Sequence, residues 1–293
     1  MKSMNWFKNV VLSSLLAFTL AGCAERESRE NIVSVSIAPL HYFVDRLTDE
    51  ALEVNVMVPQ GASHGTYSPT ARQMQKLSDS EIYFQVPSLG YEQAFIRRLN
   101  ELNPGIKHVD LGNYIELIRG ERIDHGDHFH EGGIDPHIWM SPKVMLELLP
   151  VLRDAIVEIY PELEPTIDEN YIYVFADVEK MHFEIQEVVE NLSQRRFMIF
   201  HPALTYLARD YNLEQVSIEH EGKEPSPAQL SHLIRHAKAE NIPVIFIQEE
   251  YDVRNAQLVA QETGAEVVQI KPLAYDWLNE MEKLSQNLNI YLR

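Results

Sequence analysis

Apolar and polar residues repeat along the chain with two different periods, and each period predicts a type of element. Short apolar runs such as IVSVSI indicate buried strands, and apolar residues spaced three or four apart indicate amphipathic helices. Strand patterns lie at 32–37, 54–58, 82–86, 107–111, 197–200, 216–218, 244–247 and 267–270. Helical patterns lie at 41–47, 70–77, 91–102, 144–160, 203–211, 227–240, 256–263 and 275–288. Strands that alternate with helices of this length predict an α/β fold, with parallel sheets covered on both faces.

A long helical pattern separates the two sets of strands. Residues 166–193 place apolar side chains at helical spacing without any Pro or Gly. A helix of that length would extend roughly 40 Å at about 1.5 Å per residue. Because strands and helices alternate both before and after this pattern, the sequence predicts two α/β lobes with mostly parallel sheets, joined by a long linker helix.

The N-terminus has the pattern of an export signal. Lys2 and Lys8 precede an apolar run at 10–20, which is too short to span a bilayer as a stable helix. The run ends in LAGC at Cys23, the only cysteine, and this ending resembles the lipobox of bacterial lipoproteins. That resemblance implies cleavage before Cys23 and a lipid on Cys23; the alternative is an ordinary signal peptide with a chance cysteine. We therefore expect an exported protein, lipid-anchored to a bacterial membrane on its periplasmic or extracellular face.

The predicted domain organisation has five segments, and no internal repeat relates the two lobes. The segments are a signal peptide at 1–22, a lipid-anchored tether at 23–31, an N-terminal lobe at 32–141 with a His-rich loop at 124–131, a connecting segment at 142–194 that holds the linker helix, and a C-terminal lobe at 195–293.

Composition and charge narrow the classes of partner. The chain has 293 residues and a formal net charge of -19. This charge argues against nucleic acid and anionic lipid as partners, because both require a basic face. With Cys23 as the only cysteine, the chain forms no intramolecular disulfide and has no thiolate left for catalysis or metal binding. The candidate catalytic or metal-binding groups are therefore histidines and carboxylates.

Histidines are concentrated between residues 125 and 137. His125, His128 and His130 are interspersed with Gly, Asp and Phe just before a Gly-Gly pair, which predicts a flexible loop. His137 follows Asp-Pro, and the proline stiffens its approach. Neutral imidazole suits zinc, copper, nickel and iron, so this pattern predicts an accessory metal-collecting loop beside a metal site. The alternative is a polar loop next to a structural histidine.

Three histidines fall at or near the carboxyl ends of predicted strands, where open α/β sheets bind ligands. His64 lies in the loop after the second strand, His201 directly follows the strand at 197–200, and His137 closes the crossing between the lobes. Each of the three taken alone is well explained as a structural residue. Their joint placement predicts a metal site in the cleft between the lobes.

Five segments resemble a known family. They read VPQGASHGTYSPT, DPHIWMSP, FHPALTYLARDYNLEQVSIEHEGKEPSPAQL, VIFIQEEYD and KPLAYDW. Together they resemble the ZnuA-like solute-binding proteins that supply zinc or manganese to ABC importers. The resemblance implies two α/β lobes with a rigid linking helix, a metal ion bound in the cleft, no enzymatic activity, and a permease with its ATPase subunit as partners. We also expect a monomer.

The ligand positions of that family fall on histidines in this chain. The resemblance implies His137 and His201 as ligands, and His64 as the third, although its imidazole stands one residue earlier than in the usual family motif. A histidine rather than a glutamate at 201 favours Zn²⁺, because Mn²⁺ prefers carboxylate oxygen and Zn²⁺ accepts imidazole well. Zn²⁺ is therefore the expected ligand, and Mn²⁺ the less favoured one.

The fourth ligand position stays open in the sequence. Lys271 stands where the family often has a carboxylate, and Gln248 stands where many members have glutamate, so neither offers a strong ligand. The fourth ligand is then water or one of the carboxylates Glu249, Glu250 and Asp276. We include Asp276 in the predicted site.

Other functions are compatible with the sequence. A lipid-anchored zinc-dependent hydrolase also has three ligands and an open water position, and Glu219, Glu221 and Glu224 lie in a segment that could reach the cleft. However, the chain has neither an HExxH motif nor a clustered HxHxD signature. An Mn²⁺-specific binding protein of the same family is another alternative, and nothing in the sequence favours an adhesin. We therefore expect capture of Zn²⁺ outside the cytoplasmic membrane and its delivery to an ABC importer.

Overall fold

The computed structural model describes residues 31–92, 95, 99, 101, 103–120, 123–124, 129–130, 133–219 and 225–293. Asn31–Arg293 forms one compact unit. The predicted signal peptide, Cys23 and nearly all of the tether lie outside the described residues, as do His125 and His128.

The first lobe is built on a four-stranded parallel sheet. Its strands are β1 (Ile32–Ile37), β2 (Glu53–Val58), β3 (Ile82–Gln85) and β4 (Lys107–Asp110), in the spatial order β2-β1-β3-β4. Helices α2 (Ala38–Thr48) and α3 (Ala71–Asp79) connect successive strands. Helix α3 begins after Thr70, whose side chain accepts a hydrogen bond from the backbone N–H of Gln73. This cap fixes the end of the long loop between β2 and α3, which carries His64.

The second lobe repeats this architecture with a separate parallel sheet. Its strands are β7 (Arg196–Ile199), β8 (Glu214–Ser217), β9 (Val244–Gln248) and β10 (Glu266–Ile270), in the order β10-β9-β7-β8. Its helices are α7 (Thr205–Asp210), α8 (Pro227–Ala239), α9 (Arg254–Thr263) and α10 (Trp277–Leu292). Strand β9 is buried throughout, as expected for an inner strand covered on both faces. The predicted fold of two α/β lobes with parallel sheets is confirmed.

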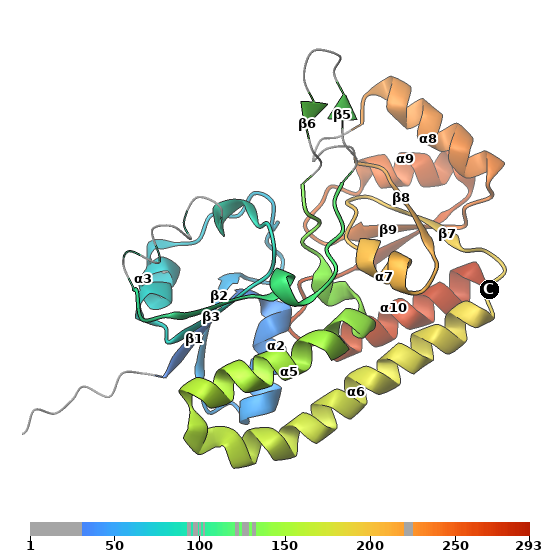
Figure 1. The fold of residues 1–293 in the computed structure, drawn as a ribbon. Helices are drawn as coiled ribbons and strands as arrows, with labels where there is room; N and C mark the ends of the chain where they lie inside the picture. The colour runs from blue at the N-terminus through green and yellow to red at the C-terminus, as the bar shows by residue number, and fades with distance from the viewer. Residues whose placement is uncertain are drawn as a thin grey trace, which may run out of the picture. The chain divides into compact units, whose positions relative to one another are not determined.

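Two long helices join the lobes. Helix α5 (Pro142–Ile159) leads through the short 3₁₀ turn η3 (Pro161–Leu163) into α6 (Glu164–Glu190), which has 27 residues. Helix α6 packs against α2 and α5 and also against α10, so one rod supports both lobes (Figure 1). One continuous apolar core includes Val35 of the first sheet, Phe246 of the second and Val178 of α6. The predicted linker helix is thus confirmed, with its end slightly earlier than expected.

The crossing from the first lobe to α5 contains short elements that the apolar pattern does not predict. They are the 3₁₀ turns η1 (Leu111–Tyr114) and η2 (Ile138–Met140) and the two-residue strands β5 (Ile123–Asp124) and β6 (Phe129–His130). Strands β5 and β6 pair antiparallel through their backbones. The segment at 124–131, predicted as a loop, therefore includes residues of a short antiparallel ladder. The apolar pattern does not predict this ladder, because strands of two residues are too short to produce an alternating pattern.

A polar network lies inside the first lobe around Glu92. The carboxylate Oε1 accepts hydrogen bonds from the hydroxyls of Ser36, Tyr83 and Tyr91. Burial raises the pKa of Glu92 to about 7, although these hydrogen bonds act in the opposite direction. A raised carboxyl pKa means that Glu92 contributes stability below about pH 4.5, which is lost as the pH rises through about 7.

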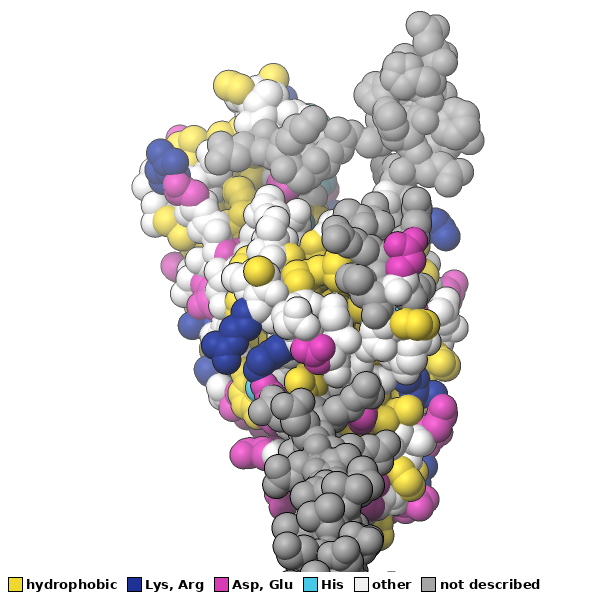
Figure 2. Space-filling model, turned by 90° about the vertical axis from the view of Figure 1, so that its left-hand side faces the viewer, with side chains coloured by type: hydrophobic (Ala, Val, Ile, Leu, Met, Phe, Trp, Pro, Cys, Tyr) yellow, Lys and Arg dark blue, Asp and Glu magenta, His cyan; other side chains and the backbone are white. Residues whose placement is uncertain are grey.

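The surface carries charge of both signs. On the face shown in Figure 2, acidic, basic and apolar side chains of the described residues are interspersed. Within the part of the chain that the structure describes, no helix is both long enough and apolar enough to cross a membrane.

Candidate metal centre

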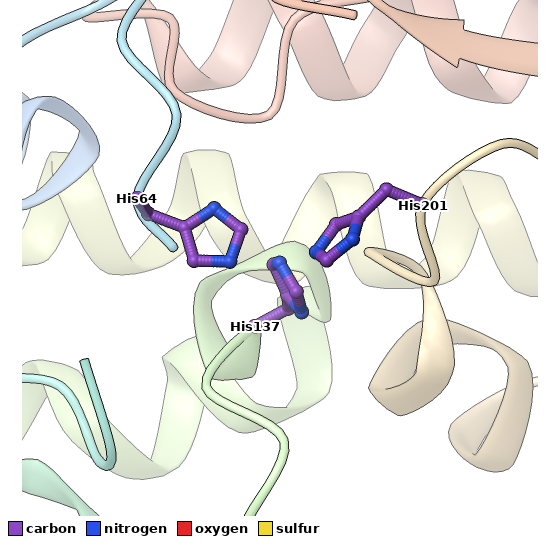
Figure 3. Close-up of side chains that lie close together, drawn as sticks. All are labelled: His64, His137 and His201. Carbon is purple, nitrogen blue, oxygen red and sulfur yellow. The ribbon is translucent and has the colours of Figure 1, made fainter. Parts of the chain in front are cut away.

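Three imidazoles from distant parts of the sequence meet in one place. His64, His137 and His201 each offer a ring nitrogen, and these nitrogens all lie within 4.8 Å of one another. The ring centroids are 4.6 Å apart for His64 and His137, 5.1 Å for His64 and His201, and 5.2 Å for His137 and His201. Figure 3 shows the rings converging from three separate segments. We call these three residues the histidine cluster.

Each histidine comes from an element that fixes its position. His64 lies in the loop after β2, where the backbone carbonyl of Ser63 accepts hydrogen bonds from the N–H groups of Thr66 at 3.2 Å and Tyr67 at 2.8 Å. His137 is the residue before η2, and His201 follows β7 almost directly. Two of the three therefore come from the carboxyl ends of parallel strands, one in each lobe.

Two carboxylates, one buried and one partly buried, orient two of the imidazoles. His137 is 2% exposed, and its Nδ1 lies 2.8 Å from Oδ1 of Asp135, which also accepts the backbone N–H of His137 at 2.9 Å. The Nδ1 atom of His201 lies 2.7 Å from Oε2 of Glu219. A carboxylate can only accept at neutral pH, so each Nδ1 carries the proton and each Nε2 keeps a free lone pair.

The Nε2 atoms of His137 and His201 are available to bind a ligand. In His137 and His201 the Nε2 atom is buried and has no hydrogen-bond partner among the described residues. A buried polar atom without a partner is costly unless a ligand satisfies it. Two lone pairs with no partner beside a third imidazole are therefore suited to a cation that accepts nitrogen ligands.

The environment keeps two of the imidazoles, those of His64 and His137, neutral. Burial, followed by the nearby His137 and His201, lowers the pKa of His64 to about 2. Burial also lowers the pKa of His137, against the opposing charge of Asp135. Burial alone would raise the pKa of Asp135, but its electrostatic and hydrogen-bonding interactions with His137 outweigh burial and lower that pKa. At neutral pH His64 and His137 are thus neutral nitrogen donors, with the ionised carboxylate of Asp135 behind His137.

The cluster opens onto a cavity of about 390 Å³. Besides the three histidines, the cavity is lined by Ile118, Arg119, Gly120, Gly133, Asp135, Pro136, Pro202 and Thr205. The backbone of the chain at 118–120 and 133–135 forms one wall, where Gly120 N donates to Gly133 O at 2.9 Å. The path to the cluster therefore passes beside the base of the β5–β6 segment.

The structure does not bring Asp276 to the cluster. Its carboxylate caps α10 by accepting the backbone N–H of Asn279 at 3.2 Å, and it lines a different cavity, beside Tyr42 and Arg46. Glu249 is occupied as well, because Lys271 Nζ lies 2.8 Å from its Oε2. Among the described residues, the metal-ligating cluster consists of the three histidines, and no carboxylate belongs to it.

Gln248 has a structural role next to His201. Its Nε2 donates to the backbone carbonyl of His201 at 2.6 Å, and its Oε1 accepts the backbone N–H of His201 at 3.4 Å. This pair of bonds ties the loop after β7 to the end of β9. The side chain at 248 thus positions a candidate ligand.

Sequence reasoning missed the orienting carboxylates as partners of the imidazoles. Asp135 is two residues before His137, a spacing that allows one carboxylate to reach both the backbone N–H and the ring of the histidine. Glu219 comes just after β8, which is the neighbour of β7 in the sheet. Because parallel strands end at the same edge, that adjacency is the signal that could have paired Glu219 with His201.

Comparisons with known proteins identify the family of the chain. The sequence model of the family described as zinc-uptake complex component A, periplasmic (ZnuA) matches residues 33–289. The zinc-binding lipoprotein AdcA of Streptococcus pneumoniae (strain ATCC BAA-255 / R6) is 26% identical over 276 residues, which cover 90% of this chain but 55% of AdcA. The high-affinity zinc uptake system protein ZnuA of Bacillus subtilis (strain 168) is 26% identical over 278 residues, covering 90% of this chain and 83% of that protein.

A solved structure supports the same relationship. A crystal structure of ZnuA superposes with a TM-score of 0.80 at 31% sequence identity, covering 89% of this chain and 98% of that one. The match includes both lobes, and the chain spans about half the length of the AdcA relative. The chain therefore belongs to the zinc-uptake complex component A family, ZnuA.

Proposed function

We propose that the protein captures Zn²⁺ outside the cytoplasmic membrane and delivers it to an ABC-type importer. The observation that carries this proposal is the histidine cluster, in which nitrogen donors from two buried histidines and one partly buried histidine lie within 4.8 Å of one another. Relatives that are named for zinc binding and zinc uptake support it. In this proposal His64, His137 and His201 bind the metal and water occupies the fourth position.

The donor set favours zinc over manganese. A relative from Halalkalibacterium halodurans is named a manganese-binding lipoprotein, so the family alone does not decide the metal. Mn²⁺ prefers carboxylate oxygen, whereas Zn²⁺ binds imidazole well in a tetrahedral site. Because no carboxylate belongs to the described cluster, Zn²⁺ is the better match.

The same carboxylates argue against a hydrolase. A zinc hydrolase needs a general base within reach of the zinc-bound water. Asp135 and Glu219, two of the carboxylates near the cluster, already accept the Nδ1–H of His137 and His201. Neither can take a proton from water without losing its hold on a ligand, so we assign binding and release to this site, and no catalysis.

The proposed partners follow from binding and release. An extracytoplasmic metal carrier requires a permease and an ATPase subunit to move its cargo across the membrane, and one metal site in one chain requires no second copy. We therefore propose a monomer that docks on an ABC importer, with the domain boundaries given by the sequence analysis.

Measuring the metal content of the purified protein tests the function. One Zn²⁺ per chain, removed by chelator and restored by titration in preference to Mn²⁺, is the expected result. A protein that binds Mn²⁺ more tightly, or no metal at all, contradicts the proposal.

Replacing Cys23 by Ser should abolish lipidation and leave a soluble or unprocessed product. The lipid is proposed to be attached to this residue because Cys23 is the only cysteine and directly follows LAG. Detergent partitioning of the variant and the parent chain measures the effect. Equal partitioning of both proteins would count against the anchor.

Deleting residues 125–130 should leave one tight zinc site with an almost unchanged dissociation constant. His125 and His128 lie outside the described residues, and the side chain of His130 does too. Ordering this segment around a metal costs about 1–2 kcal/mol per fixed residue, so the segment should provide only weak accessory sites. Titration calorimetry should show the weak sites disappear. Loss of the tight site would show that this segment supplies a primary ligand and would remove His64 from the assignment.

A further inference from the structure

We propose that the cavity beside the histidine cluster binds a small carboxylate anion together with Zn²⁺. Arg119 holds this anion, and one of the anion's oxygens takes the fourth position on the metal in place of water. The inference rests on the proposed function, because the anion binds where the cluster leaves the zinc ion open. It assigns a substrate class, zinc with a small carboxylate, and a role to a residue that is not a metal ligand.

The cavity is much larger than the fourth ligand of a zinc ion requires. Its volume is about 390 Å³, whereas one water molecule takes up about 30 Å³ in the liquid. Pockets that bind small organic molecules begin at about 300 Å³. His64, His137 and His201 all line the cavity, so a molecule inside it lies next to a metal ion that the cluster holds. The space therefore fits a small organic ligand beside zinc.

The ligands in the cluster leave the charge of a bound zinc ion in place. Imidazoles bind zinc in their neutral form, and among the described residues no carboxylate belongs to the cluster. Asp135 also lines the cavity, but its Oδ1 is occupied by the backbone N–H and the ring of His137. An anionic oxygen at the fourth position is therefore attracted more strongly than a neutral water molecule.

Arg119 is the positively charged side chain in the lining of this cavity, within the part of the chain that the structure describes. It is exposed, and no described carboxylate forms an ion pair with it. Its guanidinium presents a planar fork of N–H donors that matches the two oxygens of a carboxylate. A positive charge beside a cation site opposes the metal by itself. An anion that contacts both the zinc ion and the guanidinium removes this repulsion.

The backbone fixes Arg119 in the cavity wall. Arg119 forms an antiparallel bridge with Ile134, and next to it the N–H of Asp135 donates to the carbonyl of Ile118 at 2.9 Å. The buried Tyr206 ties this pair of segments to the second lobe. Its hydroxyl donates to the carbonyl of Asp135 at 2.9 Å and accepts the N–H of Ile118 at 3.1 Å. Because the backbone is already held, anion binding has to order little more than the arginine side chain.

Zinc affinity measured with and without malonate tests the inference. Malonate is the carboxylate probe, a metal buffer keeps free Zn²⁺ constant, and sodium nitrate matches the ionic strength. An anion that binds only the zinc-loaded protein tightens zinc binding in proportion to its own occupancy, about tenfold once its concentration is about ten times its dissociation constant. We expect the zinc dissociation constant of the parent protein to fall steadily as malonate is added.

Two variants at position 119 test the role of the guanidinium. Arg119→Gln removes the charge and the fork at an exposed position, and it should weaken malonate binding by at least about 10-fold, the size of a hydrogen bond to a charged group. The tightening should then nearly disappear over the same malonate range. Arg119→Lys keeps the charge without the fork and should retain part of the tightening. Each protein is its own reference, because only the ratio of its dissociation constants with and without malonate is compared.

Arg235→Gln is the matched control. Arg235 is an exposed arginine of α8 that does not line the cavity, and its replacement changes the net charge by the same amount. This variant should show the same tightening by malonate as the parent protein.

The outcomes separate this inference from the proposed function. A parent protein without tight zinc binding at any malonate concentration overturns the function itself. A parent protein that binds zinc tightly but gains no affinity from malonate overturns only the anion site. Equal tightening in the parent protein and in Arg119→Gln overturns the role of Arg119. An equal loss in Arg119→Gln and Arg235→Gln overturns it as well, because the effect would then come from net charge.

Discussion

Replacing His137 by Ala should weaken zinc binding by at least about 100-fold, since loss of a mere hydrogen-bond partner of a ligand already costs about 10- to 100-fold. His137 is the most buried member of the cluster, and its Nε2 has no partner among the described residues. Its ring is oriented by Asp135, whose Oδ1 lies 2.8 Å from its Nδ1. A competition titration with a chromophoric chelator measures the dissociation constant.

Two further variants make this result interpretable. His137→Gln removes the imidazole but retains most of the side-chain volume and a polar group. It therefore controls for a collapse of the buried site in His137→Ala. His232→Ala removes an exposed histidine of α8 outside the cluster and should bind zinc as the parent protein does. An unchanged dissociation constant in both His137 variants would remove this residue from the metal site.

Acidification should destabilise the metal-free protein through His64. The pKa of His64 is lowered from 6.5 to about 2, chiefly by burial. As the pH falls below about 6.5, His64 binds a proton in the unfolded chain but stays neutral in the folded chain. The stability contribution of neutral His64 is therefore present above pH 6.5 and is lost as the pH falls toward 2. One such group removes up to about 1.4 kcal/mol of unfolding free energy per pH unit, or about 3 kcal/mol between pH 6.5 and 4.

The measurement compares denaturant unfolding of the parent protein and His64→Gln across this pH range. Glu92 titrates with the opposite sign, but both proteins keep it, so the difference between the two curves isolates His64. The parent should lose about 3 kcal/mol more than the variant between pH 6.5 and 4. Parallel curves would mean that His64 titrates in the folded protein as it does in solution.

The periodicity of the sequence predicts the fold well because both sheets are parallel and buried. Strands such as β1 and β9 are mostly apolar and buried throughout, and the helices between them have clear polar faces. The ends of elements are predicted less well. Helix α10 begins at Trp277 rather than at 275, because Asp276 caps it. It continues to Leu292, which is buried like Leu288 one turn before it. Capping geometry and tertiary burial decide such ends, and neither is visible in the spacing of apolar residues.

Strand ends also indicate which histidines can meet, as they do for His64 and His201. Strand ends alone do not predict the neighbours of those histidines, because each neighbour depends on which strands are adjacent. Glu219 reaches His201 because β8 lies beside β7, and Tyr251 reaches it because β9 does. Asp276 illustrates the converse case, in which a carboxylate in a suggestive segment is used to cap a helix.

A crystal structure of the zinc-loaded protein, with diffraction data at the zinc absorption edge, tests the central claim most directly. We predict one strong anomalous peak per chain, about 2.0–2.1 Å from one ring nitrogen each of His64, His137 and His201. Such a peak would lie on the Nε2 side of His137 and His201, the side that has no partner among the described residues. A peak at Asp276 or elsewhere on the surface, with the three imidazoles left without metal, would contradict the assignment.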